Sequence, residues 1–189
     1  MEYKILKKQN FSDGKYSLVP LRKKDIFKIA RWRNEQLGCL RQKKKLTKKD
    51  QKDYFQNKVY PTFSERWPEM MLFSFLLAGQ CIGYGGLVHF DWQAKRAEVS
   101  FLAETSRSKN KKIYLRDFSQ YLKLVKETAF KDLKLNRIFT ETFASRSSAH
   151  IKTLGKAGFR LEGTMRQHVK IGNQYVDSLI HGLLRKDYV

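Results

Sequence analysis

The sequence predicts a mixed α/β (α+β) fold, in which helices flank a mixed central sheet and residues 1–189 form a single domain. Two observations carry this prediction. Short apolar runs alternate along the chain with stretches in which apolar residues recur at helical spacing. A composition of 41% hydrophobic and 13% aromatic residues supplies enough apolar surface for one substantial core. We find no internal repeat, low-complexity tract or linker, so one domain is the simplest prediction.

The first third of the chain predicts one strand and a pair of helices. Residues 16–21 read as a strand that ends near a proline, and apolar residues at helical spacing from 26 to 37 predict the first helix. Thr47 and Asp50 form a capping pattern at the start of a second helix. We expect the two helices to form an α-hairpin.

The middle of the chain predicts three successive antiparallel strands. Residues 69–90 read as two apolar strands joined by a turn at 78–80, and residues 95–104 alternate between apolar and polar side chains. Three closely spaced glycines in the second strand indicate a bulge or a close approach of the backbone: Gly83, Gly85 and Gly86.

The last part of the chain predicts two helices and three further strands. Residues 114–129 form the strongest amphipathic pattern in the sequence, and residues 135–143 read as a strand. A short helix follows within residues 146–158, and residues 159–188 read as a long hairpin that turns at Gly172 and Asn173.

Charge indicates the class of partner. The chain has 39 Lys and Arg against 18 Asp and Glu, a net charge of +21, so anionic partners are expected. Nucleic acid, an acidic membrane surface and a small ligand with several phosphates all satisfy this expectation. Two basic clusters stand out: residues 41–49, and residues 107–112 at a predicted junction between a strand and a helix.

Other features exclude several classes of protein. Cys39 and Cys81 lie far apart without ligand spacing, which favours a reduced, cytoplasmic protein. The first residues contain no apolar signal core, and the longest apolar run, residues 70–78, is too short for a membrane span. The four histidines lack metal-ligand spacing, so no metal site is predicted.

The order of elements and two motifs resemble the GNAT superfamily of acetyl-CoA-dependent N-acyltransferases. Residues 135–163, "LNRIFTETFASRSSAHIKTLGKAGFRLEG", carry the most specific part of the resemblance. Residues 172–184 resemble the terminal hairpin of the ribosomal-protein-acetyltransferase-like branch. The resemblance covers residues 16–188. It implies the GNAT fold with about seven strands, acetyl-CoA as co-substrate and transfer of an acetyl group to a primary amine.

The resemblance also implies where the cofactor binds. Amides of strand 95–104 would stabilise the oxyanion, the loop at 107–112 would hold the pyrophosphate, and the short helix would flank the thioester. The loop departs from the family's glycine-rich form. Asn110 stands at the first glycine, where it can adopt a left-handed conformation, and Lys112 replaces the second small residue, so lysine charge would substitute for backbone amides. The predicted cofactor-binding residues are Val99, Ser100, Phe101, Leu102, Arg107, Ser108, Lys109, Asn110, Lys111, Lys112, Ser145, Ser147 and Ser148.

The chemistry requires a base and an acid. An alkylammonium group with a pKa of about 10 must lose a proton before it attacks. Glu98 and Glu141 are the candidate bases, and a surface or salt-bridging role is the alternative for each. Leu154 stands where many relatives have a tyrosine acid, which leaves His150, one turn earlier, as the candidate acid. An ordinary histidine on the helix surface is the alternative.

The acceptor is less closely defined. Trp32, Arg33 and Asn34 resemble the branch that acetylates amino sugars linked to nucleotides, and they would bind such a substrate by stacking and hydrogen bonding. The competing enzyme hypothesis is a protein N-terminal or ribosomal-protein acetyltransferase. A third hypothesis is a non-catalytic module that binds nucleic acid or another polyanion. It is not favoured, because the aromatic residues do not follow a basic stripe. The oligomeric state, monomer or homodimer, stays open.

Overall fold

The computed structural model describes residues 1–40, 42, 44–145 and 148–188. Within these ranges one sheet of eight strands has the order β1-β2-β3-β4-β5-β6-β8-β7. The strands are β1 (Phe11–Asp13), β2 (Tyr16–Pro20), β3 (Met70–Leu77), β4 (Gln80–Asp91), β5 (Arg96–Ala103), β6 (Arg137–Phe143), β7 (Arg160–Ile171) and β8 (Gln174–Leu184). The α-helices are α1 (Ile26–Glu35), α2 (Lys48–Tyr54), α3 (Tyr60–Thr62), α4 (Thr105–Lys109), α5 (Lys111–Glu127) and α6 (Ser148–Lys156). The predicted mixed fold is confirmed, with one strand more than the expected seven.

The additional strand, β1, lies at the edge of the sheet and pairs with β2. It has only three residues, too few for an alternating pattern to be recognised among polar neighbours. The segment before it is nonetheless anchored in the core. Tyr3 is fully buried, and its hydroxyl donates to the carbonyl of Leu72 at 2.9 Å and accepts from the amide of Leu72 at 2.7 Å.

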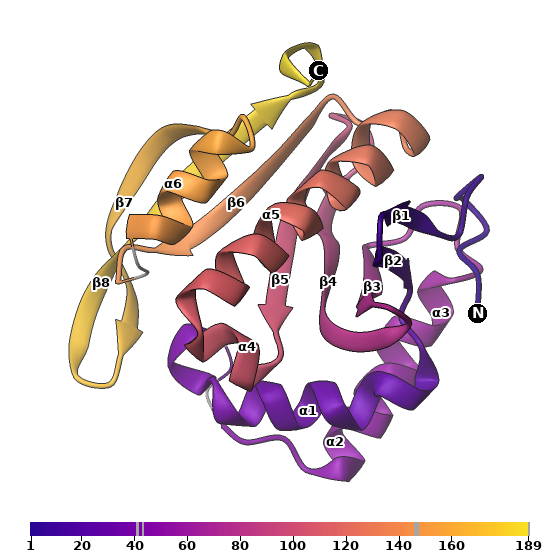
Figure 1. Cartoon of the computed structure of the whole chain (residues 1–189), viewed down its shortest axis with the longest axis horizontal. Helices are drawn as coiled ribbons and strands as arrows, with labels where there is room; N and C mark the ends of the chain where they lie inside the picture. The colour runs from indigo at the N-terminus through magenta and orange to yellow at the C-terminus, as the bar shows by residue number, and fades with distance from the viewer. Residues whose placement is uncertain (41, 43, 146–147, 189) are drawn as a thin grey trace.

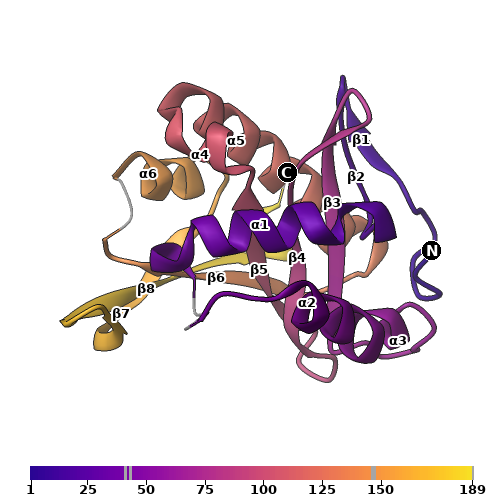
Figure 2. The ribbon, with the colours of Figure 1, turned by 90° about the horizontal axis from the view of Figure 1, so that it is seen from below.

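The helices form layers on both sides of the strands. Figure 2 shows α4, α5 and α6 on one side and α2 and α3 on the other, while α1 crosses the lower end of the central strands in Figure 1. The amphipathic helix predicted at 114–129 is confirmed as α5, which continues as the π-helical turn Thr128–Asp132. Its buried side includes Phe118, Tyr121 and Leu122.

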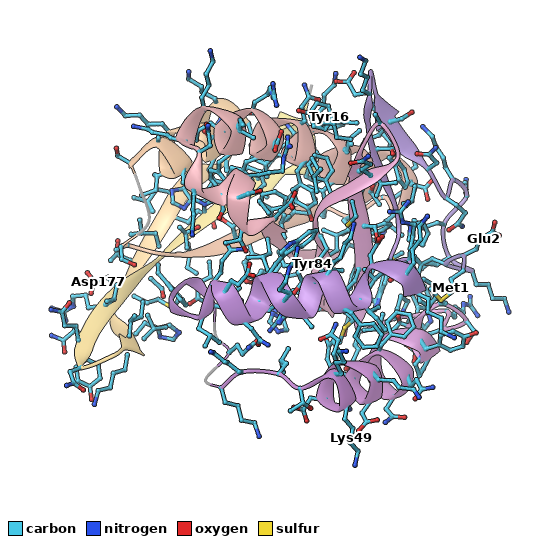
Figure 3. All side chains as sticks on the ribbon, turned by 60° about the horizontal axis from the view of Figure 1, so that its bottom comes forward. Met1, Glu2, Tyr16, Lys49, Tyr84 and Asp177 are labelled. Atoms are coloured by element: carbon cyan, nitrogen blue, oxygen red, sulfur yellow. The ribbon has the colours of Figure 1, made fainter. Side chains whose placement is uncertain are left out.

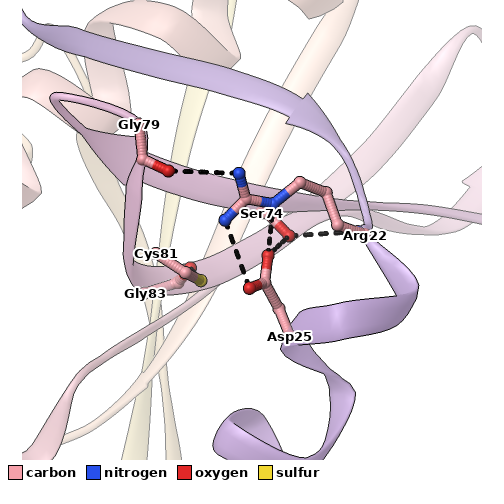
Figure 4. A network of polar contacts seen from close by, with 6 residues as sticks. All are labelled: Arg22, Asp25, Ser74, Gly79, Cys81 and Gly83. Atoms are coloured by element: carbon pink, nitrogen blue, oxygen red, sulfur yellow. Dashed lines mark hydrogen bonds and ion pairs between the residues drawn. The ribbon is translucent and has the colours of Figure 1, made fainter.

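The start of α1 is held by a buried polar network (Figure 4). Arg22 donates to both carboxylate oxygens of Asp25, at 2.6 and 3.2 Å, and Ser74 donates to the same carboxylate at 2.7 Å. Arg22 also donates to the carbonyl of Gly79 at the β3–β4 turn. Burial and, to a smaller extent, the negative charge of Asp25 raise the pKa of the neighbouring Cys81 thiol to about 12. Because α1 carries Arg33, this network fixes the position of one wall of the site described below.

The predicted cap of the second helix is confirmed. Thr47 is the N-cap of α2, where its hydroxyl accepts from the amide of Asp50 at 3.1 Å and the Asp50 carboxylate accepts from the amide of Thr47 at 2.8 Å. The helix then continues through the π-helical turn Phe55–Val59 into α3. Phe55 and Val59 of this turn are buried against the face of the sheet that α1 also covers.

The sheet opens between β5 and β6. These two strands run parallel and pair only at 96–98 with 137–139, whereas β6 pairs with β8 along its whole length. Beyond Glu98 and Phe139 the two strands therefore diverge. The long hairpin predicted at the end of the chain is confirmed as β7 and β8, and it extends the sheet on the far side of β6 (Figure 1).

The glycines of β4 provide a close approach of the backbone, as predicted. A Cβ at Gly85 would lie 2.1 Å from the carbonyl oxygen of Ser100 and 2.6 Å from the hydroxyl of Tyr121. That hydroxyl donates to the same Ser100 carbonyl at 2.6 Å, and burial raises the pKa of Tyr121, which keeps the hydroxyl protonated as a donor. Because Gly85 has no side chain, the hydroxyl of Tyr121 on α5 can reach the Ser100 carbonyl on β5 next to β4.

Among the described residues, no helix is both long and apolar enough to cross a membrane.

We expect Gly85→Ala to lower the free energy of unfolding by about 1–3 kcal/mol, because the added methyl overpacks a contact with the backbone. Denaturant unfolding measures the change. Gly155→Ala is the matched control, because Gly155 lies in α6 with nothing within 4 Å of the new Cβ. The control should be neutral or stabilising. Equal stability of the two variants would contradict the close approach.

Candidate active site

A cavity of about 450 Å³ occupies the gap between β5 and β6. Its walls come from both strands, from one residue each of α5 and α6, and from α1 and the segment after it. The lining residues are Arg33, Leu40, Gln42, Glu98, Val99, Ser100, Phe101, Phe118, Thr140, Glu141, Thr142, Phe143 and His150. Both predicted bases, the predicted acid and three of the four predicted oxyanion-strand residues therefore share one cavity.

The cavity connects the two faces of the sheet. On β5, Phe101 stacks on Phe118 and Tyr121 of α5, with ring centroids 5.3 and 4.4 Å apart. Because side chains alternate along a strand, Glu98 and Ser100 face the opposite side. Glu98 pairs with Phe139, so Glu141, two residues further along β6, shares the face of Glu98. The two carboxylates thus lie on the side away from α5, whereas His150 belongs to α6 on the α5 side (Figure 2).

Each carboxylate has a partner that holds it. Glu98 is 8% exposed, and one of its oxygens lies 2.7 Å from Nδ1 of His89. Glu141 accepts a hydrogen bond of 2.8 Å from Ser178 of β8, and Nε2 of His168 lies 3.8 Å from the same oxygen. A buried carboxylate with a histidine beside it is well arranged to accept a proton and pass it on.

The predicted acid, His150, is 8% exposed rather than lying on the helix surface. Its ring stacks on Phe118 with centroids 4.4 Å apart, and its Nδ1 lies 2.8 Å from the hydroxyl of Tyr114. The sequence pattern predicts Tyr114 only as a core residue of the amphipathic helix. No spacing signal linked it to a residue 36 positions later, so the pair appears only when α5 and α6 pack together.

Backbone amides of β5 face the gap. The carbonyl of Lys95 accepts hydrogen bonds from the amides of Asn136 and Arg137, so the peptide groups of alternate residues along β5 are directed toward β6. By this alternation the N–H groups of Val99 and Phe101 point to the same side. The parallel pairing of Glu98 with Phe139 uses the N–H group of Val99, whereas Phe101 lies beyond the last β5–β6 pair, where the strands have separated. Of the four residues predicted to supply oxyanion donors, Phe101 is oriented for it.

The basic segment at 107–112 differs from the loop that the sequence predicts. Residues 105–109 form α4, and Asn110 has φ −93°, so the prediction of a left-handed Asn110 is wrong. Asn110 is instead the N-cap of α5, where its side chain accepts from the amide of Ile113 at 3.0 Å. A helix forms in place of a loop because Thr, Ser, Arg and Lys all tolerate helical backbone, whereas the glycines that the family has in this loop disfavour a helix.

Arg107 has a structural role in α4. It donates to both oxygens of Asp117, at 2.6 and 3.1 Å, and Asp117 is 1% exposed. The hydrogen bonds to Asp117 raise the pKa of the Arg107 guanidinium. Tyr16, labelled beside α5 in Figure 3, donates to the same carboxylate at 2.9 Å. Ser108 donates to the carbonyl of Thr105, within α4.

The N-terminus of α5 is suited to an anion. Lys111 and Lys112 are exposed in its first turn, which contains no acidic residue. Cations at the positive end of a helix repel the helix dipole, and a bound anion relieves this repulsion. The diphosphate of a CoA molecule carries the charge that these residues would bind. Lys109 lies at the end of α4, in the same region.

The short helix after β6 is confirmed as α6. Its first residue, Ser148, and the preceding turn residue, Ser145, are both exposed. Ser147, the third serine predicted to contact the cofactor, lies outside the described residues.

The Trp-Arg-Asn triplet of α1 does not act as a unit. Trp32 is 1% exposed in the core, so the prediction that it stacks on a sugar is wrong. Asn34 exchanges hydrogen bonds with the backbone of Leu46, at 2.7 and 2.8 Å, and thus holds the segment after α1. Of the three, only Arg33 lines the cavity, where it donates to Gln42 and to the hydroxyl of Tyr84 (labelled in Figure 3). Helical spacing explains the difference, because adjacent residues of a helix point about 100° apart.

Comparisons with known structures agree with the overall fold. A spermidine N-acetyltransferase from Vibrio cholerae, in complex with CoA and spermine, superposes with a TM-score of 0.78 at 16% identity, over 93% of this chain and 99% of that one. A probable GNAT-family acetyltransferase from Chromobacterium violaceum gives 0.74 at 16% identity, over 99% and 91%. A GNAT-family acetyltransferase from Bacillus anthracis gives 0.71 at 15% identity, over 94% and 99%. These likenesses concern the fold.

No curated protein matches the chain significantly in sequence. The family model described as acetyltransferase (GNAT) domain matches residues 18–180, from β2 to β8. That range includes every element that lines the cavity between β5 and β6. The chain therefore belongs to the GNAT acetyltransferase family and is an N-acetyltransferase that uses acetyl-CoA.

Proposed function

We propose that the protein transfers an acetyl group to a primary amine within the gap between β5 and β6, with Glu98 as the base and His150 as the acid. One observation carries the proposal: a single cavity joins Glu98 on one face of the sheet to His150 on the other. Acetyl-CoA supplies the acetyl group as a thioester. One residue can then deprotonate the amine while another protonates the leaving thiolate, without a covalent enzyme intermediate.

Glu98 is the better candidate for the base. It is directly opposite Val88 on β4, and it faces the side of the sheet where α1 and α2 leave room for an acceptor. It removes a proton from the ammonium, and His89 is placed to receive that proton. Glu141 lies on the same face and attracts the cationic amine before it is deprotonated.

The remaining steps use groups on the other side of the gap. The N–H group of Phe101 stabilises the negative charge that develops on the carbonyl oxygen when the amine attacks. The nitrogen of the tetrahedral adduct carries one surplus proton, which Glu98 takes after it has passed the first proton to His89. The C–S bond then breaks, the thiolate takes a proton from His150, and solvent reprotonates His150. Tyr114 orients His150 by its hydrogen bond to Nδ1.

The acceptor classes differ in their support. An amino sugar linked to a nucleotide is supported by Arg33 and by the net charge, but no longer by Trp32. A peptide N-terminus is supported by the open cavity and by the resemblance of the terminal hairpin. These classes are tested by assaying acetyl transfer to an amino sugar nucleotide, a peptide and spermidine. The readout is the CoA thiol that is released with each acceptor.

We expect Glu98→Gln to lower kcat by about 100-fold or more, the usual range for loss of a general base. The amide keeps the shape of the side chain, so the Kd for CoA in calorimetry should not change. Glu65→Gln is the control, because it removes an exposed carboxylate that does not line the cavity. Unchanged turnover at saturating substrates would exclude Glu98 as the base, and the same assay on Glu141→Gln would then test the second candidate.

We expect the double variant Lys111→Gln, Lys112→Gln to raise the Kd for CoA about tenfold, because charge-assisted contacts with the phosphates are lost. Pantetheine, which lacks these phosphates, should bind the variant and the wild type equally. Lys48→Gln with Lys49→Gln is the matched control, because these lysines hold the corresponding first two positions of α2. Unchanged affinity for CoA would place the phosphates elsewhere.

The polyanion hypothesis is tested by the salt dependence of binding. Binding of CoA with one-to-one stoichiometry at physiological salt supports the enzyme. Binding of long DNA with a steep salt dependence, without binding of CoA, would support the non-catalytic module.

A further inference from the structure

A second cavity, of about 320 Å³, lies next to the proposed site and is not required by the acetyl transfer itself. It is bounded by α1, α2 and the turn Phe55–Val59 on one side and by β3, β4 and β5 on the other. Most of its walls are apolar and include Ile29, Leu46, Phe55, Val59, Leu72 and Val88. A cavity of this size is at the lower end of the range for small-molecule sites, which suits one aromatic ring or a branched aliphatic group.

The charge of this cavity excludes a strongly cationic occupant. Arg33 is the only charged residue among the described residues that line it, and none of them is a carboxylate. A polyamine would therefore bring several positive charges to an apolar wall and a guanidinium, with no counter-charge. An uncharged apolar group instead loses its contact with water at no electrostatic cost.

The position of this cavity assigns it to the acceptor. It shares Arg33, Leu40, Ser100 and Phe101 with the first cavity, so the two meet at β5. Val88 in its wall is directly opposite Glu98, and residues opposite each other in an antiparallel pair share a face. Helix α6, which carries the proposed acid, and helix α5 lie on the other side of the sheet (Figure 2). A group attached close to the amine that Glu98 deprotonates can therefore enter this cavity.

We propose that this cavity binds an uncharged aromatic or branched aliphatic group attached close to the acceptor amine, which makes hydrophobic primary amines the substrate class. The proposal rests on the proposed acetyl transfer at Glu98. It distinguishes this chain from its spermidine-acetylating structural neighbours, whose named acceptors are polyamines.

The test compares phenethylamine, ethanolamine and spermidine as acceptors with acetyl-CoA. Burial of one aromatic group predicts a kcat/KM for phenethylamine about 10- to 100-fold above that for ethanolamine. Spermidine should be no better than ethanolamine. Equal values for the three amines, or a preference for spermidine, would overturn the proposal while leaving the acetyl transfer in place.

Leu46→Glu introduces a carboxylate at the cavity without disturbing the core. Leu46 is half-buried in the segment before α2, and its hydrogen bonds to Asn34 use the backbone only. This variant should lower kcat/KM for phenethylamine about tenfold and raise it for spermidine. Leu161→Glu on β7 is the matched control, because it adds the same charge at a side chain that is 58% exposed and lies outside both cavities.

Two further measurements separate the alternatives. If Leu46→Glu changes the use of hexanoyl-CoA against acetyl-CoA but not the preference among amines, the cavity serves the acyl chain and the proposal is wrong. Calorimetric binding of phenethylamine in the presence of CoA does not need turnover. Binding that Leu46→Glu weakens supports the proposal even if no amine is acetylated, in which case the acetyl transfer at Glu98 is what fails.

Discussion

The separation of β5 from β6 after three paired residues is the constraint on which the site depends. Paired strands would use their peptide groups for each other, and no cavity would pass through the sheet. Each strand is held apart from the other by a different neighbour. Phe101 packs β5 against α5, and β8 pairs with β6 along its full length. The gap is therefore maintained by packing on both sides.

The groups proposed for catalysis are positioned by partners on other strands and helices. Glu98 contacts His89 of β4, Glu141 contacts Ser178 of β8, and His150 contacts Tyr114 of α5. Such contacts restrict the rotamers of the side chains before substrate binds, which is how enzymes keep reacting groups in place. The same logic applies to α1, which the buried network around Asp25 anchors to β3.

Charge is distributed unevenly with respect to these functions. The lysines at the start of α5 are exposed, where phosphates would bind, whereas the second cavity beside Glu98 is apolar and has Arg33 as the one charged residue among its described lining. The net charge of +21 therefore reflects basic residues on the surface rather than charge in the proposed acceptor cavity. This separation explains why the charge alone left several classes of partner open.

The sequence by itself determined most of the elements and the family, because helical spacing, the cap at Thr47 and the motif around α6 are local patterns. It also named Glu98, Glu141 and His150 as candidates for the base and the acid. Only the tertiary structure decided that Trp32 is buried, that Arg107 binds Asp117 and that Tyr114 meets His150. It also decided that an apolar cavity adjoins Glu98. The physical reason is that these outcomes depend on which elements pack together, and no spacing within one segment encodes the side chains of its neighbour.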